Sequence, residues 1–183
     1  MLECEVKLLD IDKHAVITKL LSLWAVQEKE ELIVDVYLET LKPKQMRSRI
    51  RCTEQSTILT CKYKLPTTTT KQAYEFDTIL PHDYLVENDL WSKLVNHVRI
   101  KKRITYTRWG YLFDIDQYRG LPPILEIEWP DETSIQKAIH LLGRENYKQT
   151  PCGGKGVYAY YKIDYPKATP KFVWRLLSLI RCL

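Results

Sequence analysis

Charged and apolar residues alternate along several short segments of the chain, which is the pattern of a β-strand with one polar face. In residues 3–7 two acids and a base stand at every second position, with Cys4 and Val6 between them. Successive side chains of a strand point to opposite faces, so the three charges share one face. The same charged spacing recurs in six further segments: Arg49/Arg51, Lys62/Lys64, Glu75/Asp77, Lys101/Arg103, Asp114/Asp116 and Glu126/Glu128.

Each of these six segments is a pair of like charges, which distinguishes them from ordinary water-facing strands. A solvated strand face usually mixes signs, because like charges brought together on one sheet face repel and weaken it. Acidic and basic pairs occur here in equal number. The pattern favours an enclosed site, in which carboxylates hold metal ions and basic side chains hold an anion.

The hydrophobic pattern predicts many strands and few helices. Besides the first strand we expect strands at 31–38, 46–52, 57–64, 74–80, 100–108, 111–118, 124–129, 147–150 and 157–163. We expect helices from an Asp10 or Asp12 cap to about residue 24, at 83–98, from a Thr133/Gln136 capping box to Gly143, and at 170–183. These elements predict a mainly β (α+β) fold, an eight-stranded antiparallel β-barrel with a polar lumen and a few helices packed outside it.

Composition narrows the possible environments. No apolar run reaches the ~18–20 residues that a membrane-spanning helix needs, and the charged strand begins too early for a secretory signal. Five cysteines, an odd number with no CxxC pair, indicate reduced thiols and a cytoplasmic location. The net charge of +5 fits an anionic ligand but does not predict DNA binding.

Two kinds of site are disfavoured by residue type. The chain has six glycines and no Gly-rich phosphate loop, so a bound phosphate must be held by lysine and arginine side chains. The four histidines, at 14, 82, 97 and 140, have no ligand spacing and are expected to be structural or surface residues. Oxygen ligands without His or Cys suit Mg²⁺ or Mn²⁺.

The charged pairs, taken together, predict a lumen of nearly zero net charge. Eight acids and seven bases from the seven segments sum to −1. Such a lumen would attract a triphosphate only after divalent cations had bound, so metal dependence is expected if all fifteen groups face inward.

The order of the motifs resembles the CYTH family, which comprises class IV adenylate cyclases, thiamine triphosphatases and related triphosphate tunnel metalloenzymes. Residues 3–7 match its ExExK strand, and residues 48–51 and 59–62 are similar to its RxR and LTxK strands. Later segments resemble its ExE, KxR, DxD and EIE strands, at residues 75–77, 101–103, 114–116 and 126–128. The resemblance covers about residues 2–163, so we expect a tunnel domain at 1–166 and a helical tail at 167–183.

The resemblance implies roles for individual residues. The implied metal ligands are Glu3, Glu5, Asp114, Glu126 and Glu128, with Asp116 as a sixth. The implied triphosphate-binding residues are Lys7, Arg49, Arg51, Lys62, Lys64, Lys101 and Arg103, joined by Lys155 on a weaker match; Lys7 and Arg103 are the expected catalytic residues. The strand that carries Glu75 departs from cyclase-like members, because Ala73 stands where they often have a basic residue.

Three functions remain open on the sequence. The first is a Mg²⁺- or Mn²⁺-dependent hydrolase that cleaves a phosphoanhydride bond of inorganic tripolyphosphate or of an organic or nucleoside triphosphate. The second is a class IV-type adenylate cyclase that makes cyclic AMP from ATP. The third is a non-catalytic binder of nucleotides or polyphosphate. The expected partner is a small molecule that contains a triphosphate, and a homodimer is a further expectation.

Overall fold

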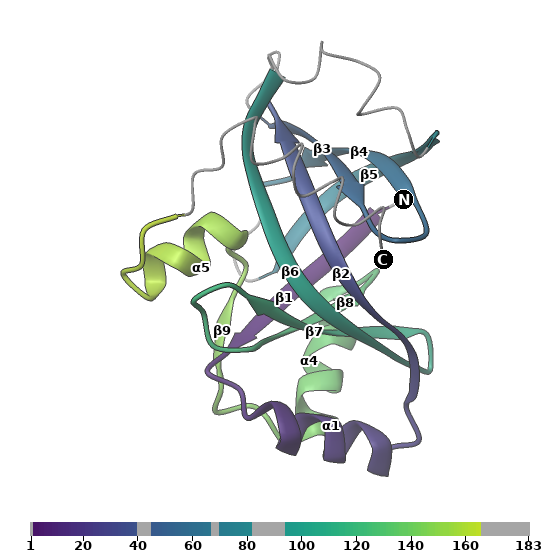
Figure 1. Ribbon diagram of the computed structural model, residues 1–183. Helices are drawn as coiled ribbons and strands as arrows, with labels where there is room; N and C mark the ends of the chain where they lie inside the picture. Colours follow the sequence, from purple (N-terminus) through teal and green to yellow (C-terminus); the bar gives the residue numbers. More distant parts are fainter. Residues whose placement is uncertain (1, 40–44, 67–69, 82–93, 166–183) are drawn as a thin grey trace.

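The computed structural model describes residues 2–39, 45–66, 70–81 and 94–165. These residues form one antiparallel sheet with three helices around it (Figure 1). The strands are β1 (Leu2–Leu9), β2 (Val26–Leu38), β3 (Met46–Cys52), β4 (Thr57–Lys64), β5 (Lys71–Leu80), β6 (Val95–Arg108), β7 (Tyr111–Tyr118), β8 (Ile124–Trp129) and β9 (Lys148–Thr150). The helices are α1 (Lys13–Ser22), α4 (Glu132–Leu142) and α5 (Gly154–Tyr160).

The sheet closes on itself, so eight of its strands form a ring. Its order is β5-β4-β3-β2-β6-β7-β8-β1-β9, and an additional pairing joins β5 to β1. That closing pairing is short and runs from Leu2↔Tyr74 to Glu5↔Lys71, while β9 lies outside the ring on the edge of β1. The predicted eight-stranded antiparallel barrel is therefore confirmed.

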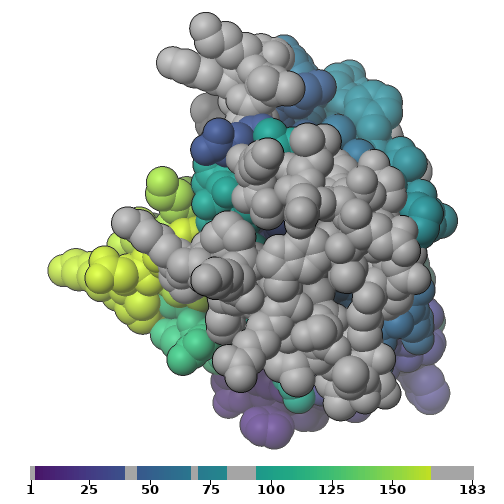
Figure 2. Space-filling view, turned by 45° about the horizontal axis from the view of Figure 1, so that its top comes forward, coloured from purple at the N-terminus to yellow at the C-terminus, as the bar shows by residue number. Residues whose placement is uncertain are grey.

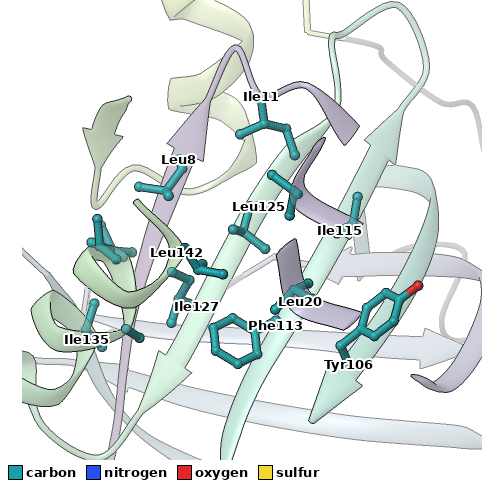
Figure 3. Close-up of a cluster of buried hydrophobic side chains, with 14 of the residues drawn as sticks. Leu8, Ile11, Leu20, Tyr106, Phe113, Ile115, Leu125, Ile127, Ile135 and Leu142 are labelled. Atoms are coloured by element: carbon teal, nitrogen blue, oxygen red, sulfur yellow. The ribbon is translucent and has the colours of Figure 1, made fainter. Parts of the chain in front are cut away.

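The main core lies between the outer face of the ring and the helices α1 and α4. Figure 3 shows Leu8, Phe113 and Ile127 from three strands pointing toward Leu20 of α1 and Ile135 of α4. These contacts use the apolar alternate positions of β1, β6, β7 and β8. Since that face of each strand is buried against helices, the charged positions between them must point into the ring.

β1 illustrates this division most clearly. Cys4, Val6 and Leu8 belong to the helix-covered core. Glu5 and Lys7 are equally buried, at 3% exposed each, but they lie on the opposite face of the strand. Their burial comes from the other walls of the ring, so the ring encloses charged groups in its interior.

The segment after β9 corrects one prediction. Residues 157–163 were expected to form a strand, yet Gly154–Tyr160 forms the helix α5, which projects at one side of the molecule (Figures 1 and 2). Val157 and Tyr158 pack into a buried cluster with Leu9 and Tyr118, and the Tyr158 hydroxyl donates to the Arg119 carbonyl at 2.9 Å. Because β9 and β8 already occupy the two edges of this part of β1, tertiary packing prevails over the β propensity of the segment.

Helix boundaries also differ in part from expectation. Asp12 caps α1 by accepting from the Ala15 amide at 3.0 Å, as one of the two expected caps. The predicted Thr133/Gln136 capping box is wrong, because Asp131 caps α4 and accepts from the Ser134 amide at 2.8 Å. Gly143, with a φ of 63°, ends α4 as predicted.

Several strands begin earlier than predicted. β2, β5 and β6 start at Val26, Lys71 and Val95 instead of residues 31, 74 and 100. The start of β6 contradicts the end of the helix predicted at 83–98, and residues 83–93 of that helix lie outside the described residues. The predicted tail at 167–183 also lies outside them.

The four cysteines of the described segments, Cys4, Cys52, Cys61 and Cys152, are free thiols, as expected. Among the helices of these segments, none has the length and apolar character needed to span a bilayer.

Candidate functional site

The ring of strands encloses a cavity of about 470 Å³ that is lined mainly by charged side chains. Thirteen of the fourteen site residues predicted from the sequence line it: Glu3, Glu5, Lys7, Arg49, Arg51, Lys62, Lys64, Lys101, Arg103, Asp114, Glu126, Glu128 and Lys155. The fourteenth, Asp116, is fully buried beside the cavity and not among its lining residues.

Carboxylates from three strands gather at one part of this cavity. Glu3, Glu5 and Glu128 form one triplet, and Asp114, Glu126 and Glu128 form a second. Within each triplet the possible ligand oxygens all lie within 4.8 Å of one another. Glu128 belongs to both triplets, because β8 lies between β1 and β7 in the ring.

Burial and crowding of negative charge raise the pKa of two of these carboxylates, Glu128 and Glu3. Burial, together with the neighbouring Glu126, Glu3 and Asp114, holds the pKa of Glu128 well above its usual range. Burial raises the pKa of Glu3 to about 8, helped by a hydrogen bond with Glu75 and opposed by Lys62. Carboxylate oxygens are the donors that Mg²⁺ and Mn²⁺ prefer, so both triplets fit a divalent ion.

Asp116 is separated from both triplets by its basic partners. Its carboxylate accepts from Lys101 Nζ at 2.7 Å and from Arg103 Nε and Nη2 at 2.6 and 2.8 Å. The Tyr118 hydroxyl donates to it as well, at 3.2 Å. The structure therefore does not bring Asp116 together with the other predicted metal ligands, and its contacts are those of a group that orients basic residues.

Lys7 and Arg103, the predicted catalytic residues, are buried and shared between carboxylates. Lys7 Nζ lies 2.6 Å from both Glu5 and Glu126. Arg103 donates to Asp114 and Asp116, and its Nη2 lies 3.3 Å from Glu126. Burial alone would lower the pKa of Lys7, but the two glutamates outweigh it and raise that pKa well above its ordinary value.

Two further lysines of the cavity, on β4 and β6, have different surroundings. Lys62 of β4 bridges Glu3 at 2.7 Å and Glu75 at 2.6 Å. Lys101 is different: burial and the neighbouring Arg103 outweigh the Asp116 carboxylate and lower the pKa of its amine to about 7.

A second region of the cavity is dominated by arginines. The carboxylate of Asp35 on β2, which is 0% exposed, contacts three guanidinium groups. Its oxygens lie 2.8 Å from Arg51 Nε, 3.0 Å from Arg99 Nη2 and 3.9 Å from Arg49 Nε. Burial would raise the pKa of Asp35, but the three arginines outweigh it and hold that pKa well below its ordinary value.

Asp35 and Arg99 are functional candidates that the sequence analysis missed. Arg99 stands two positions before Lys101, so extending the alternation of that pair by one step would have found it. Asp35 gives no such signal, because it is a lone acid between Val34 and Val36.

Lys71 and several aromatic residues were also missed. Lys71 lies 2.7 Å from Glu5, so β5 brings a basic residue to the site despite the Ala73 departure. Tyr37, His97 and Tyr165 line the cavity near Arg99, and the rings of Tyr37 and His97 stack with centroids 4.4 Å apart. His97, expected to be a structural or surface residue, is therefore also a lining residue of the site.

The charge balance of the cavity differs from the one expected. Among the described residues, 12 basic and 7 acidic side chains line it, and Asp35 and Asp116 add two buried acids. The formal charge of the cavity is therefore +3, whereas −1 was expected from the sequence. Asp77, which was counted inside, is exposed and does not line the cavity.

The described residues form an antiparallel ring of eight strands around a charged cavity, which is the architecture of a tunnel-like β-barrel. Candidate adenylate cyclases among the solved structures share this fold, in agreement with the resemblance drawn from the motifs. The sequence comparisons add nothing to this: no family model matches the chain, and neither does any curated protein.

Solved structures from three different organisms share the fold. The PH1012 protein of Pyrococcus horikoshii superposes with a TM-score of 0.70 at 22% identity, over 85% of this chain and 98% of that one. A candidate adenylate cyclase of Vibrio parahaemolyticus gives 0.65 at 12% identity, over 87% and 98%. HpAC1 of Hippeastrum, a candidate adenylyl cyclase with a dominant triphosphatase activity, gives 0.60 at 13%, over 90% and 97%.

Proposed function

We propose that this protein is a metal-dependent hydrolase that cleaves a phosphoanhydride bond of a triphosphate. One observation carries the proposal: two carboxylate triplets and a cluster of arginines line the same enclosed cavity. The triplets suit a divalent cation and the arginines suit phosphate oxygens. A triphosphate with bound metal ions is a ligand that uses both regions at once.

Glu3, Glu5, Asp114, Glu126 and Glu128 are the residues that would hold Mg²⁺ or Mn²⁺. A bound divalent ion would neutralise phosphate charge and lower the pKa of a coordinated water. Asp116 fits this ligand set less well than the resemblance implies, since its oxygens are taken by Lys101 and Arg103.

The basic residues would bind and orient the substrate. Arg49 and Arg51 face the cavity with one carboxylate, Asp35, between them, and Lys62, Lys64 and Lys155 add positive charge around them. Lys7 bridges the two carboxylate triplets through Glu5 and Glu126, and Arg103 contacts Glu126 of the second triplet. Both would stabilise charge on the phosphate that departs.

A cyclase is the second candidate, because two of the superposing structures are candidate adenylate cyclases. In that reaction a ribose hydroxyl replaces water as the nucleophile and pyrophosphate leaves. Tyr37, His97 and Tyr165 line the cavity and could contact an organic group on the triphosphate. A non-catalytic binder is the third alternative, since every contact described above would serve binding alone.

One assay separates the three. The protein is incubated with tripolyphosphate, ATP or thiamine triphosphate in the presence of Mg²⁺ or Mn²⁺, and the products are identified. Orthophosphate release supports the hydrolase, and cyclic nucleotide with pyrophosphate supports the cyclase. Binding without turnover leaves the binder. We expect orthophosphate, and no orthophosphate from any of the three substrates would refute the proposal.

A further inference from the structure

The basic residues of the cavity differ in how completely they are paired. Lys7 and Arg103 each contact two or three carboxylates. Arg49, Arg51 and Arg99, here called the arginine cluster, share the carboxylate of Asp35, and Arg49 also lies 3.5 Å from Glu75. The arginine cluster therefore brings three cations together around one shared carboxylate.

Asp35 contacts the three guanidiniums without satisfying them. Its two oxygens accept from Arg51 at 2.8 and 3.4 Å and from Arg99 at 3.0 Å. The Nε atoms of Arg49 and Arg99 are buried and have no hydrogen-bond partner among the described residues. Buried donors without partners are costly, so the cluster is prepared to receive acceptor oxygens.

Arg99 is held in place from several sides. Its Nη2 also donates to the Tyr37 hydroxyl, and its guanidinium carbon lies 4.9 and 5.4 Å from the ring centroids of Tyr37 and Tyr118. A Cβ at position 154 would lie 2.3 Å from Arg99 Nη1, so Gly154 leaves the space that this guanidinium needs. The position of Arg99 is thus built by contacts from β2, β7 and α5.

We propose that Arg99 is a further phosphate-binding residue and that Asp35 is the positioning residue that aligns the arginine cluster on one phosphate group. This inference rests on the proposed function. Asp35 pairs across the sheet with Arg51 on β3 and with Arg99 on β6, so its carboxylate lies between arginines of the two neighbouring strands. An acid there counteracts the repulsion between the guanidiniums and fixes their orientation before substrate binds.

The test compares Asp35→Asn and Arg99→Gln with the wild type. The Asp35 variant keeps the size of the side chain but can no longer hold two guanidiniums, and the Arg99 variant removes one cation of the cluster. Asp77→Asn is the matched control, because Asp77 is an exposed acid on β5 outside the cavity lining. KM and kcat are measured for tripolyphosphate with Mg²⁺, and its dissociation constant is measured by calorimetry.

We expect both variants to raise KM about 10- to 100-fold, the effect of losing an aligned, charged hydrogen bond. We expect kcat to stay within about threefold, and the Mg²⁺ concentration for half-maximal activity to be unchanged, since neither residue belongs to a carboxylate triplet. The control should match the wild type. A residue with a structural role only would lower the melting temperature and leave KM unchanged.

The outcomes separate this inference from the proposed function. An unchanged or lower KM in both variants would overturn the inference about Asp35 and Arg99. A lower KM in Asp35→Asn would mean that Asp35 competes with phosphate instead of aligning the arginines. If Asp35→Asn does not fold, Arg99→Gln decides alone. If the wild type binds tripolyphosphate but hydrolyses none of the three triphosphates, the proposed function fails, and the ratios of dissociation constants still test the cluster. If the wild type binds none of the three, both fail.

Discussion

Glu126 and Glu128 stand two residues apart on β8 and face the same cavity, yet changing each to Gln should shift stability in opposite directions. Glu126 lies 2.6 Å from Lys7 and 3.3 Å from Arg103 and is buried. Removing one partner of a buried ion pair costs about 3–5 kcal/mol. Because Gln retains one acceptor for Lys7, we expect Glu126→Gln to lower the free energy of unfolding by about 2–3 kcal/mol.

Glu128 has the opposite surroundings. Among the described residues it forms no salt bridge, and Glu3, Glu126 and Asp114 crowd it. Its pKa in the folded protein is raised, so the unfolded chain ionises first and the folded state loses stability as pH rises above the ordinary value of 4.5. Neutralising this crowded carboxylate should therefore let Glu128→Gln gain stability at neutral pH, by about 0.5–2 kcal/mol, the usual size of a gain from an improved charge arrangement.

Urea unfolding of both variants, with EDTA and then with excess Mg²⁺, tests this difference. Without metal, the gain of Glu128→Gln should be larger at pH 8 than at pH 5. With Mg²⁺, the wild type should gain stability by mass action and Glu128→Gln should gain less, since it lacks a ligand common to both triplets. Shifts of the same sign in both variants would refute the crowded-carboxylate account. Shifts below about 0.5 kcal/mol in both would indicate solvated side chains.

Three further predictions follow from other parts of the structure. Tripolyphosphate should raise the melting temperature of the wild type, and Arg51→Ala should reduce that rise in a fluorimetric melt; no rise at any concentration would count against an anion site. Burial and nearby Arg99 lower the pKa of His97 from 6.5 to about 4, so the free energy of unfolding should fall as pH drops through this range. His97→Gln should lessen the fall, and a pH profile identical to that of the wild type would contradict this prediction. In urea unfolding, Gly110→Ala should lower the free energy of unfolding by about 1–3 kcal/mol more than Gly120→Ala does. Both glycines have a positive φ, but of the two only a Cβ at position 110 would meet a side chain, that of Trp129 at 2.4 Å.

The sequence predicted the fold well where alternation was strong. β3, β4, β7 and β8 have the bounds expected from their patterns, because charged residues recur at every second position in the middle or second half of each strand. Since one face of these strands packs on a core, a shift of one residue would bury the wrong side chains, and the register is therefore well determined by sequence alone.

Asp35 could not be found in this way, because its role comes from pairing between strands. Its neighbours Val34 and Val36 are core residues, and a lone acid between them gives no spacing to compare. Only the register, which places Asp35 opposite Arg51 on one side and Arg99 on the other, shows that it serves guanidiniums from two strands. α5 escaped prediction for a related reason: its Val and Tyr residues favour a strand until their contacts with Leu9 and Tyr118 are known.

The uneven distribution of charge explains how a cavity with a net positive charge can still suit metal ions. Lys7 and Arg103 lie among the carboxylates but are each shared by several of them, and they leave Glu128 without an ion pair among the described residues. The arginine cluster lies apart from the triplets, where Asp35 holds Arg51 and Arg99 in place. Because buried charges are stabilised only by partners in direct contact, the arginines cannot satisfy the triplets from across the cavity. Divalent ions would satisfy one region and phosphate oxygens the other, so a metal–triphosphate complex matches this cavity better than either component alone.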